Sequence, residues 1–204
     1  RFEPGLNEDI AATAVWGTQQ TELLGGGPYD GVFGLWYGKN PGVDRSEDVF
    51  RHGNINGTSP HGGMLAISGD DPGASSSTIP NQCEQSFAAL MMPVLYPADI
   101  TDILAFGRFG FELSRYSGLW VAMKTVADTV ETTATVDLDA LPRKFTHPAD
   151  PVQRSDVIAR WPDDRWSQDR RLQEVKLPAA LEFAAQNRID RVVFKRDLTV
   201  HCVT

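Results

Sequence analysis

Segments typical of strands and helices alternate between residues 32 and 125, and this alternation constrains the fold more than any other feature. Short apolar runs predict strands; they lie at 32–37, 64–68, 93–96 and 119–125. Stretches with helical spacing lie at 7–24, 80–92 and 99–116. Strands that alternate with helices form βαβ units around a largely parallel sheet. The sequence therefore predicts an α/β fold that binds ligands at the carboxyl ends of its strands.

Two of the predicted helices begin with a capping residue. Asn7 precedes the acids Glu8 and Asp9, which the helix dipole favours in a first turn. Asp99 stands in the same position before the third helix, with Asp102 three residues later. Taken alone, Glu8 is most simply an acid that complements a helix dipole.

The stretch Gly38–Gly63 is rich in Gly, Asn, Pro and His and predicts a long irregular loop with a short helix near 46–52. Loops of this length are uncommon in compact domains and are usually functional or disordered. This one carries residues suited to acid–base chemistry and carboxylate binding; they are Lys39, His52, Asn54 and His61. By residue pattern alone, a solvated loop explains them better.

The loop after the second strand offers a metal site or a turn. Gly69-Asp70-Asp71 places two carboxylates after a strand, as Mg²⁺ sites do. Asp71-Pro72-Gly73 is also favourable turn chemistry, and we favour the turn and predict no metal. The run Ser75–Thr78 either binds an anion through its N–H groups or forms the polar start of the next helix.

Composition excludes several classes of protein. The formal net charge of -8 leaves no basic face for nucleic acid and suits a cytoplasmic protein. No apolar run reaches the length of a membrane helix. Cys83 and Cys202 are too few for an iron–sulfur cluster, and we expect two buried free thiols rather than a disulfide. The absence of GxSxG and GxxxxGK[ST] patterns argues against a hydrolase elbow and a P-loop.

Beyond residue 136 the pattern changes. Residues 137–174 hold many Pro, Asp and Arg residues and predict an extended linker. Residues 175–187 predict an Ala-rich helix, followed by short strands at 191–194 and 198–203. We therefore divide the chain into a domain at 1–136, the linker at 137–174 and a segment at 175–204 that leads into a following domain.

Several stretches together resemble one family, the long-form indolepyruvate or 2-oxoacid:ferredoxin oxidoreductases, which depend on thiamine diphosphate. They are NEDIAATAVWGTQQ from Asn7, the stretch Asp30–Gly63, SGDDPGASSSTIPNQ from Ser68 and the strand–helix–strand unit at 93–131. The segment RLQEVKLPAALEFAAQNRIDRVV is similar to the part that precedes the family's next domain. The resemblance implies a pyrimidine-binding (Pyr-type) three-layer fold that lacks its most N-terminal part.

The resemblance also implies a role for Glu8. In thiamine enzymes a glutamate of the Pyr domain hydrogen-bonds N1′ of the aminopyrimidine, and Glu8 matches this position. A carboxyl group buried against an apolar ring keeps its proton more readily and can share it with N1′. The resemblance places Lys39, His52, Asn54 and His61 on the substrate side, without individual roles.

The family implies further components that this chain does not carry. Mg²⁺ is expected on a separate diphosphate-binding (PP) domain of the same enzyme, and iron–sulfur clusters elsewhere in the full-length protein. The implied substrates and partners are a 2-oxo acid such as an arylpyruvate, coenzyme A and ferredoxin, in a homodimer. The chain alone is then expected to be inactive. Two alternatives remain: a non-catalytic Pyr-like interaction module, and a flavodoxin-like nucleotide binder, which lacks a GxGxxG turn here.

Overall fold

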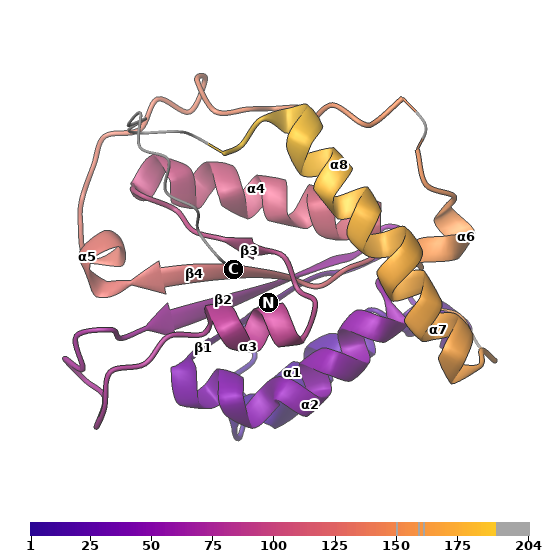
Figure 1. Ribbon diagram of the computed structural model, residues 1–204, viewed down its shortest axis with the longest axis horizontal. Coiled ribbons are helices and arrows are strands. Elements are labelled where there is room, and N and C mark those ends of the chain that lie inside the picture. The colour runs from indigo at the N-terminus through magenta and orange to yellow at the C-terminus, as the bar shows by residue number, and fades with distance from the viewer. Residues whose placement is uncertain (150, 159, 161, 191–204) are drawn as a thin grey trace, which may run out of the picture.

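Four parallel strands form a single sheet in the computed structural model, which describes residues 1–149, 151–158, 160 and 162–190 (Figure 1). The strands are β1 (Phe33–Lys39), β2 (Gly63–Asp70), β3 (Val94–Leu95) and β4 (Val121–Val126). Their order in the sheet is β1-β2-β4-β3, with every neighbouring pair parallel. The predicted α/β class with a parallel sheet is confirmed.

Alternate residues of the strands face two separate hydrophobic cores. Met64 and Ala66 of β2 pack with the core of one face, and Leu65 packs with the core of the other. Helices α1 (Glu8–Thr18), α2 (Asn40–Asn56) and α3 (Glu84–Ala89) cover the first face, and α4 (Ile100–Ser117) and α8 (Leu177–Asn187) cover the second (Figure 1). This three-layer arrangement is consistent with a Pyr-type fold.

Both capping predictions are confirmed. The Asn7 side chain accepts a hydrogen bond from the N–H of Ile10, and α1 begins at Glu8. Asp99 accepts one from the N–H of Asp102 and α4 begins at Ile100. The first helix is shorter than expected, because α1 ends at Thr18 and a separate 3₁₀ turn spans Thr21–Leu24.

The predicted irregular loop over Gly38–Gly63 is wrong. A helix of 17 residues, α2, begins directly after β1 and runs to Asn56. Its glycines mark close packing, because a Cβ on Gly53 would lie 2.2 Å from the Trp120 ring. Tertiary packing therefore selects residues that local propensity assigns to loops.

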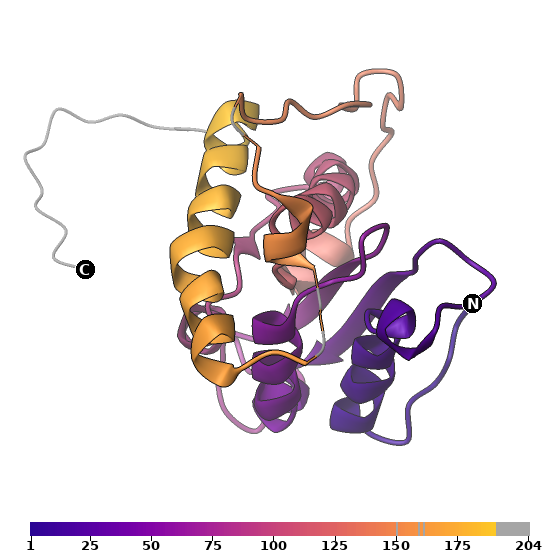
Figure 2. The same cartoon turned by 90° about the vertical axis from the view of Figure 1, so that its right-hand side faces the viewer.

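The C-terminal part lies against the second face. Figure 2 shows α8 and the N-terminal helix α1 on opposite sides of the molecule. Two short helices, α6 (Arg154–Val157) and α7 (Arg165–Arg171), lie where an extended linker was expected, and a π-helical turn over Leu172–Lys176 joins α7 to α8. Phe183 of α8 is fully buried beside Phe109 of α4. The division into a domain, a linker and a following segment stays a prediction.

Two other expectations concern the rest of the chain. The strands predicted at 191–194 and 198–203 lie outside the described residues. None of the helices among the described residues combines the length and the apolar character that crossing a membrane requires.

Candidate functional site at the carboxyl end of the sheet

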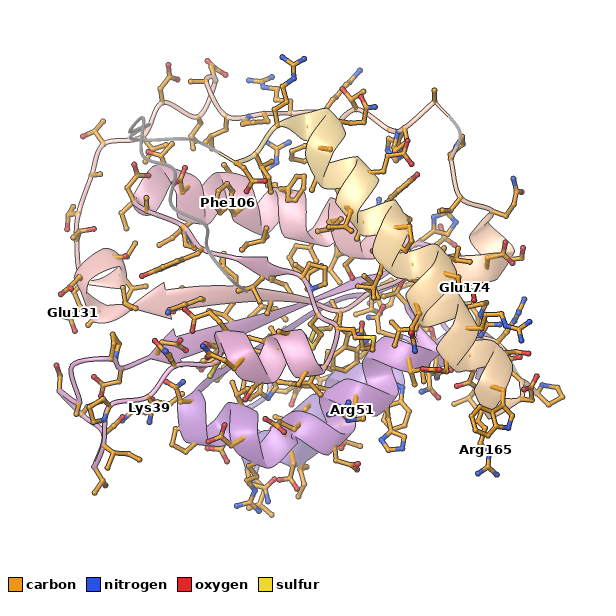
Figure 3. All side chains as sticks on the ribbon, in the orientation of Figure 1. Lys39, Arg51, Phe106, Glu131, Arg165 and Glu174 are labelled. Atoms are coloured by element: carbon orange, nitrogen blue, oxygen red, sulfur yellow. The ribbon has the colours of Figure 1, made fainter. Side chains whose placement is uncertain are left out.

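The parallel strands bring their carboxyl ends to one edge of the sheet, where open α/β sheets bind ligands. Lys39 ends β1, Asp70 ends β2 and Val126 ends β4. Helix α2 starts at this edge, and the loop at 71–83 leads from it to α3. Figure 3 shows Lys39 at this end, with Arg51 farther along α2.

A buried carboxylate organises this edge. The side chain of Asp70 is 0% exposed, and that of Lys124 is only 6% exposed. The Oδ2 atom of Asp70 lies 3.5 Å from Nζ of Lys124 and accepts a hydrogen bond of 2.9 Å from the N–H of Cys83. Its Oδ1 atom accepts from the hydroxyl of Ser68. Asp70 thereby fixes β4 and the start of α3 against the end of β2.

The amine of Lys124 has two more partners. It forms an ion pair with Glu84 and lies 4.8 Å from the centre of the Tyr96 ring. Burial opposes the charged amine, but the hydrogen bond and attraction from Glu84 raise the pKa of Lys124 above its usual value. The same contact overcomes burial at Glu84 and lowers the pKa of that carboxyl. Both groups are therefore charged at neutral pH.

Asp71 closes the following loop on itself. Its carboxylate accepts hydrogen bonds of 2.8 and 2.9 Å from the N–H groups of Ser75 and Ser76. The Ser76 and Ser75 bonds lower the pKa of Asp71 to about 2. The amine of Lys39 lies 3.9 Å from this carboxylate and donates to the carbonyl of Ser76.

These contacts bear on the turn that the sequence predicts for this loop. Residues 72–73 form the predicted turn. The N–H groups of Ser75 and Ser76 hold an anion, the carboxylate of Asp71, and α3 begins only at Glu84. Within the part of the chain that the structure describes, no three acidic, His or Cys side chains gather as a metal site.

Glu8 lies beside this edge. Its backbone carbonyl accepts a hydrogen bond of 3.0 Å from the indole N–H of Trp36, which fixes the start of α1 against β1. Its side chain lies over Gly42 in the first turn of α2, where an added Cβ would come within 2.6 Å of Glu8 Cγ. The Glu8 carboxylate makes no hydrogen bond or ion pair with any described residue. It is partly exposed and able to accept a bond from a ligand.

The structure does not bring all the predicted site residues together. Glu8 and Lys39 share the region where β1 ends and α2 begins. His52 lies 12 residues into α2, roughly 18 Å along its axis from the carboxyl end. His61 precedes β2 at the opposite edge. Asn54 is fully buried, with hydrogen bonds to three backbone groups.

The contacts of His52 and His61 also lie away from the carboxyl end of the sheet. His52 is exposed, with Nδ1 2.8 Å from the carbonyl of Asp48 and its ring 6.0 Å from that of Trp16. His61 is exposed, and its carbonyl accepts from Arg115 at 3.5 Å. The substrate-side roles of His52, Asn54 and His61 stay predictions, and they do not enter the proposal below.

Sequence reasoning misses several groups at the carboxyl end. Several buried polar atoms there have no hydrogen-bond partner among the described residues; they include Asn40 Oδ1, Asn81 Oδ1 and Glu84 Oε2. Buried polar atoms without a partner are rare and often mark the place of a water or ligand. Two sequence signals point to these groups: Asn40 follows a strand directly, and Lys124 lies within an apolar strand.

Cys83 lies next to Asn40 and is buried. The amide of Asn40 lies 2.7 Å from its sulfur, and burial raises the pKa of the thiol to about 12. The thiol is therefore protonated at neutral pH and a poor nucleophile. Cys83 is free, as expected, and Cys202 lies outside the described residues.

Comparison with known proteins gives a distant relative. The chain is 30% identical over 125 residues to the indolepyruvate oxidoreductase subunit IorA of Methanothermobacter thermautotrophicus. This covers 61% of the chain but only 18% of the relative. No family model matches the chain, and no solved structure does. The similarity supports a distant link to that family and leaves the activity of the whole protein as a proposal.

Proposed function

We propose that this chain forms the aminopyrimidine side of the cofactor site in a thiamine-diphosphate-dependent 2-oxoacid oxidoreductase. The observation that carries the proposal is the carboxylate of Glu8, which lacks a partner in the described chain and lies at the carboxyl end of a parallel sheet. The distant similarity to an indolepyruvate oxidoreductase subunit supports the same family.

The residues at this edge suit a flat, polar heterocycle. Glu8 offers a carboxyl group that can share a proton with N1′ of an aminopyrimidine, and the Oδ1 atoms of Asn40 and Asn81, which no described residue bonds, offer acceptors for an amino group on the ring. When bound, the cofactor supplies the carbon nucleophile and the electron sink for 2-oxoacid decarboxylation. In this proposal the role of Glu8 is to hold a proton at N1′ of the bound cofactor.

The remaining partners follow from the same proposal. Mg²⁺ and the diphosphate group belong on a PP domain, and iron–sulfur clusters on other parts of the full-length enzyme. The substrate is a 2-oxo acid such as indolepyruvate, the acyl group passes to coenzyme A and the electrons pass to ferredoxin. Lys39 borders the cofactor site next to the loop that Asp71 closes.

The test is a Glu8→Gln substitution in the complete native protein. We expect 2-oxoacid-dependent reduction of ferredoxin or a dye to fall by about 100-fold or more, because acid–base assistance to the cofactor is lost. The melting temperature is expected to stay unchanged, because the Glu8 side chain has no bond within the described structure. Turnover like that of the wild type would overturn the role of Glu8.

Asp9→Asn is the matched control. Asp9 is the next acid in the same helical turn, and it pairs with Arg45 at 2.9 Å on the surface. We expect this variant to keep its turnover. An equal loss in both variants would indicate damage to the start of α1 rather than to a cofactor contact.

A non-catalytic interaction module is the second candidate. Three apolar side chains on the α4 side of β1 are exposed, with Phe33 51%, Leu35 47% and Tyr37 62% exposed. Such a row of apolar side chains is typical of an interaction surface. Absence of 2-oxoacid turnover and of thiamine diphosphate binding in the complete native protein would favour this candidate.

A further inference from the structure

A pocket lies at the other end of the sheet, on the face covered by α4. It has a volume of about 430 Å³, within the range of small-molecule sites. Phe33 at the start of β1, the outer side of α4 and the segment at 143–147 form its walls. The length of β1 places it roughly 20 Å from Lys39, and Glu8 lies on the opposite face of the sheet with α1.

The walls of this pocket are fixed by contacts on both sides. Arg108 of α4 donates a hydrogen bond of 3.0 Å to the carbonyl of Arg143. The side chain of Asn187 accepts from the N–H of Thr146 at 2.8 Å and donates to its carbonyl at 2.9 Å. The Phe145 ring packs on that of Phe109, with centroids 5.5 Å apart. A ligand therefore meets a preformed site and has little chain to order.

One side of the pocket is aromatic. The rings of Phe33 and Phe111 lie 4.9 Å apart at an angle of 55°. The guanidinium of Arg115 lies 4.6 Å from the centre of the Phe33 ring. Rings in this arrangement offer faces and edges to another flat ring.

The rim of the pocket is cationic, in a chain whose net charge is -8. Arg108 and Lys144 have no carboxylate partner among the described residues, although Arg108 keeps its bond to a carbonyl. The acid that lines the pocket, Glu112, lies 3.7 Å from Arg115. Arg143 pairs with Asp139 outside the lining. Positive charge is therefore left for a ligand.

We propose that this pocket binds a small planar aromatic anion, a carboxylate or a phosphate ester, independently of the cofactor site at the carboxyl end. The ring stacks beside Phe33 and Phe111. The acidic group lies between Arg108 and Lys144, where Arg offers a planar pair of donors and Lys a point charge.

The test measures binding of two probes to the 204-residue chain by calorimetry, 2-naphthoate and 1-naphthyl phosphate, with neutral 2-naphthalenemethanol for comparison. We expect saturable binding of at least one anion, weaker binding of the alcohol, and an affinity that falls as salt rises. The tighter of the two anions identifies the acidic group. No saturable binding at millimolar concentrations, or equal binding of the alcohol, overturns the proposal.

Two single variants and one control locate the site. Arg108→Gln and Lys144→Gln are each expected to weaken binding of the anion by roughly tenfold, the effect of losing one charged contact. Arg165→Gln removes the same charge from an exposed residue of α7 that does not line the pocket. Equal affinity in Lys144→Gln and Arg165→Gln would show that the anion binds elsewhere. Arg108→Gln also removes the hydrogen bond to the carbonyl of Arg143 and could alter the pocket, so Lys144→Gln provides an independent test of the anion site.

Discussion

The two ends of the sheet use the same kind of side chain in opposite ways. At the amino end, the buried amides of Gln19 and Asn54 use both oxygen and nitrogen in hydrogen bonds. At the carboxyl end, the Oδ1 atoms of Asn40 and Asn81 are buried without a partner. The amides at the amino end join chain segments, whereas at the carboxyl end two amide oxygens bond no described residue.

This difference between the two ends holds for the buried amide side chains but not for every buried polar group. The hydroxyls of Thr58 and Ser59, near the amino end, also lack partners. Hydroxyls can rotate to meet a water, whereas a buried amide oxygen depends on a fixed donor. The amides therefore distinguish the two ends of the sheet better than the hydroxyls do.

The largest expected effect comes from removing a structural amide. Asn54→Ala leaves the N–H of Trp120 and the carbonyls of Leu90 and Met91 without their partner. We expect the free energy of unfolding to fall by about 3 kcal/mol or more. Asn40→Ala removes an oxygen with no partner and one contact to Cys83, and is expected to cost under about 1 kcal/mol.

Urea unfolding of both variants checks this pair. If Asn40→Ala destabilises the chain as much as Asn54→Ala does, the carboxyl end is as firmly bonded as the amino end and the comparison fails. A small effect of Asn40→Ala on unfolding, joined to weaker cofactor binding in the complete protein, would support it.

The sequence predicts the positions of the strands well but misses the long helix α2. Apolar runs and caps at Asn7 and Asp99 set most element positions, because these signals are local. Helix α2 is missed because Gly53 is selected by contact with Trp120, 67 residues away along the chain. The same long-range packing buries Asn54 and gives its side chain three backbone hydrogen bonds, which no local sequence pattern indicates. Glu8 is visible only through the family resemblance, since its local pattern is that of any helix start.

The second expected effect concerns the side-chain amine of Lys176, which joins the π-helical turn to the last turn of α2 at the amino end of the sheet. Lys176 is fully buried and donates to the carbonyl of Ile55, at 2.9 Å, in the last turn of α2. Burial, with repulsion from Arg171 and Arg160 and a smaller opposing attraction from Asp163, lowers the pKa of Lys176 from 10.5 to about 7. Between these values the unfolded chain binds more protons than the folded one.

Stability is therefore expected to rise with pH from about 7 to about 10.5, with a contribution from Lys176 of up to about 1.4 kcal/mol per pH unit. Lys176→Met should remove this slope, whereas Lys144→Met, at an exposed lysine, should keep it. Urea unfolding at several pH values within this window measures both. An unchanged slope in Lys176→Met would mean that the amine stays charged in the folded chain.

The smallest expected effect tests whether the carboxyl end is ordered by its own charge. Hydrogen bonds from Ser76 and Ser75 lower the pKa of Asp71 to about 2, below the 3.8 of an unfolded chain. Asp71 therefore adds stability that is fully present above pH 3.8 and is lost as pH falls through about 2. Asp71→Asn keeps the shape of the side chain but removes the charge.

We expect Asp71→Asn to lower the melting temperature slightly at pH 7 and to reduce the loss of stability between pH 4 and pH 2, measured by circular dichroism. Asp139→Asn is the control, because Asp139 pairs with an exposed Arg143 outside this loop. A melting curve for Asp71→Asn that follows the wild type across this range would mean that the loop does not depend on its carboxylate.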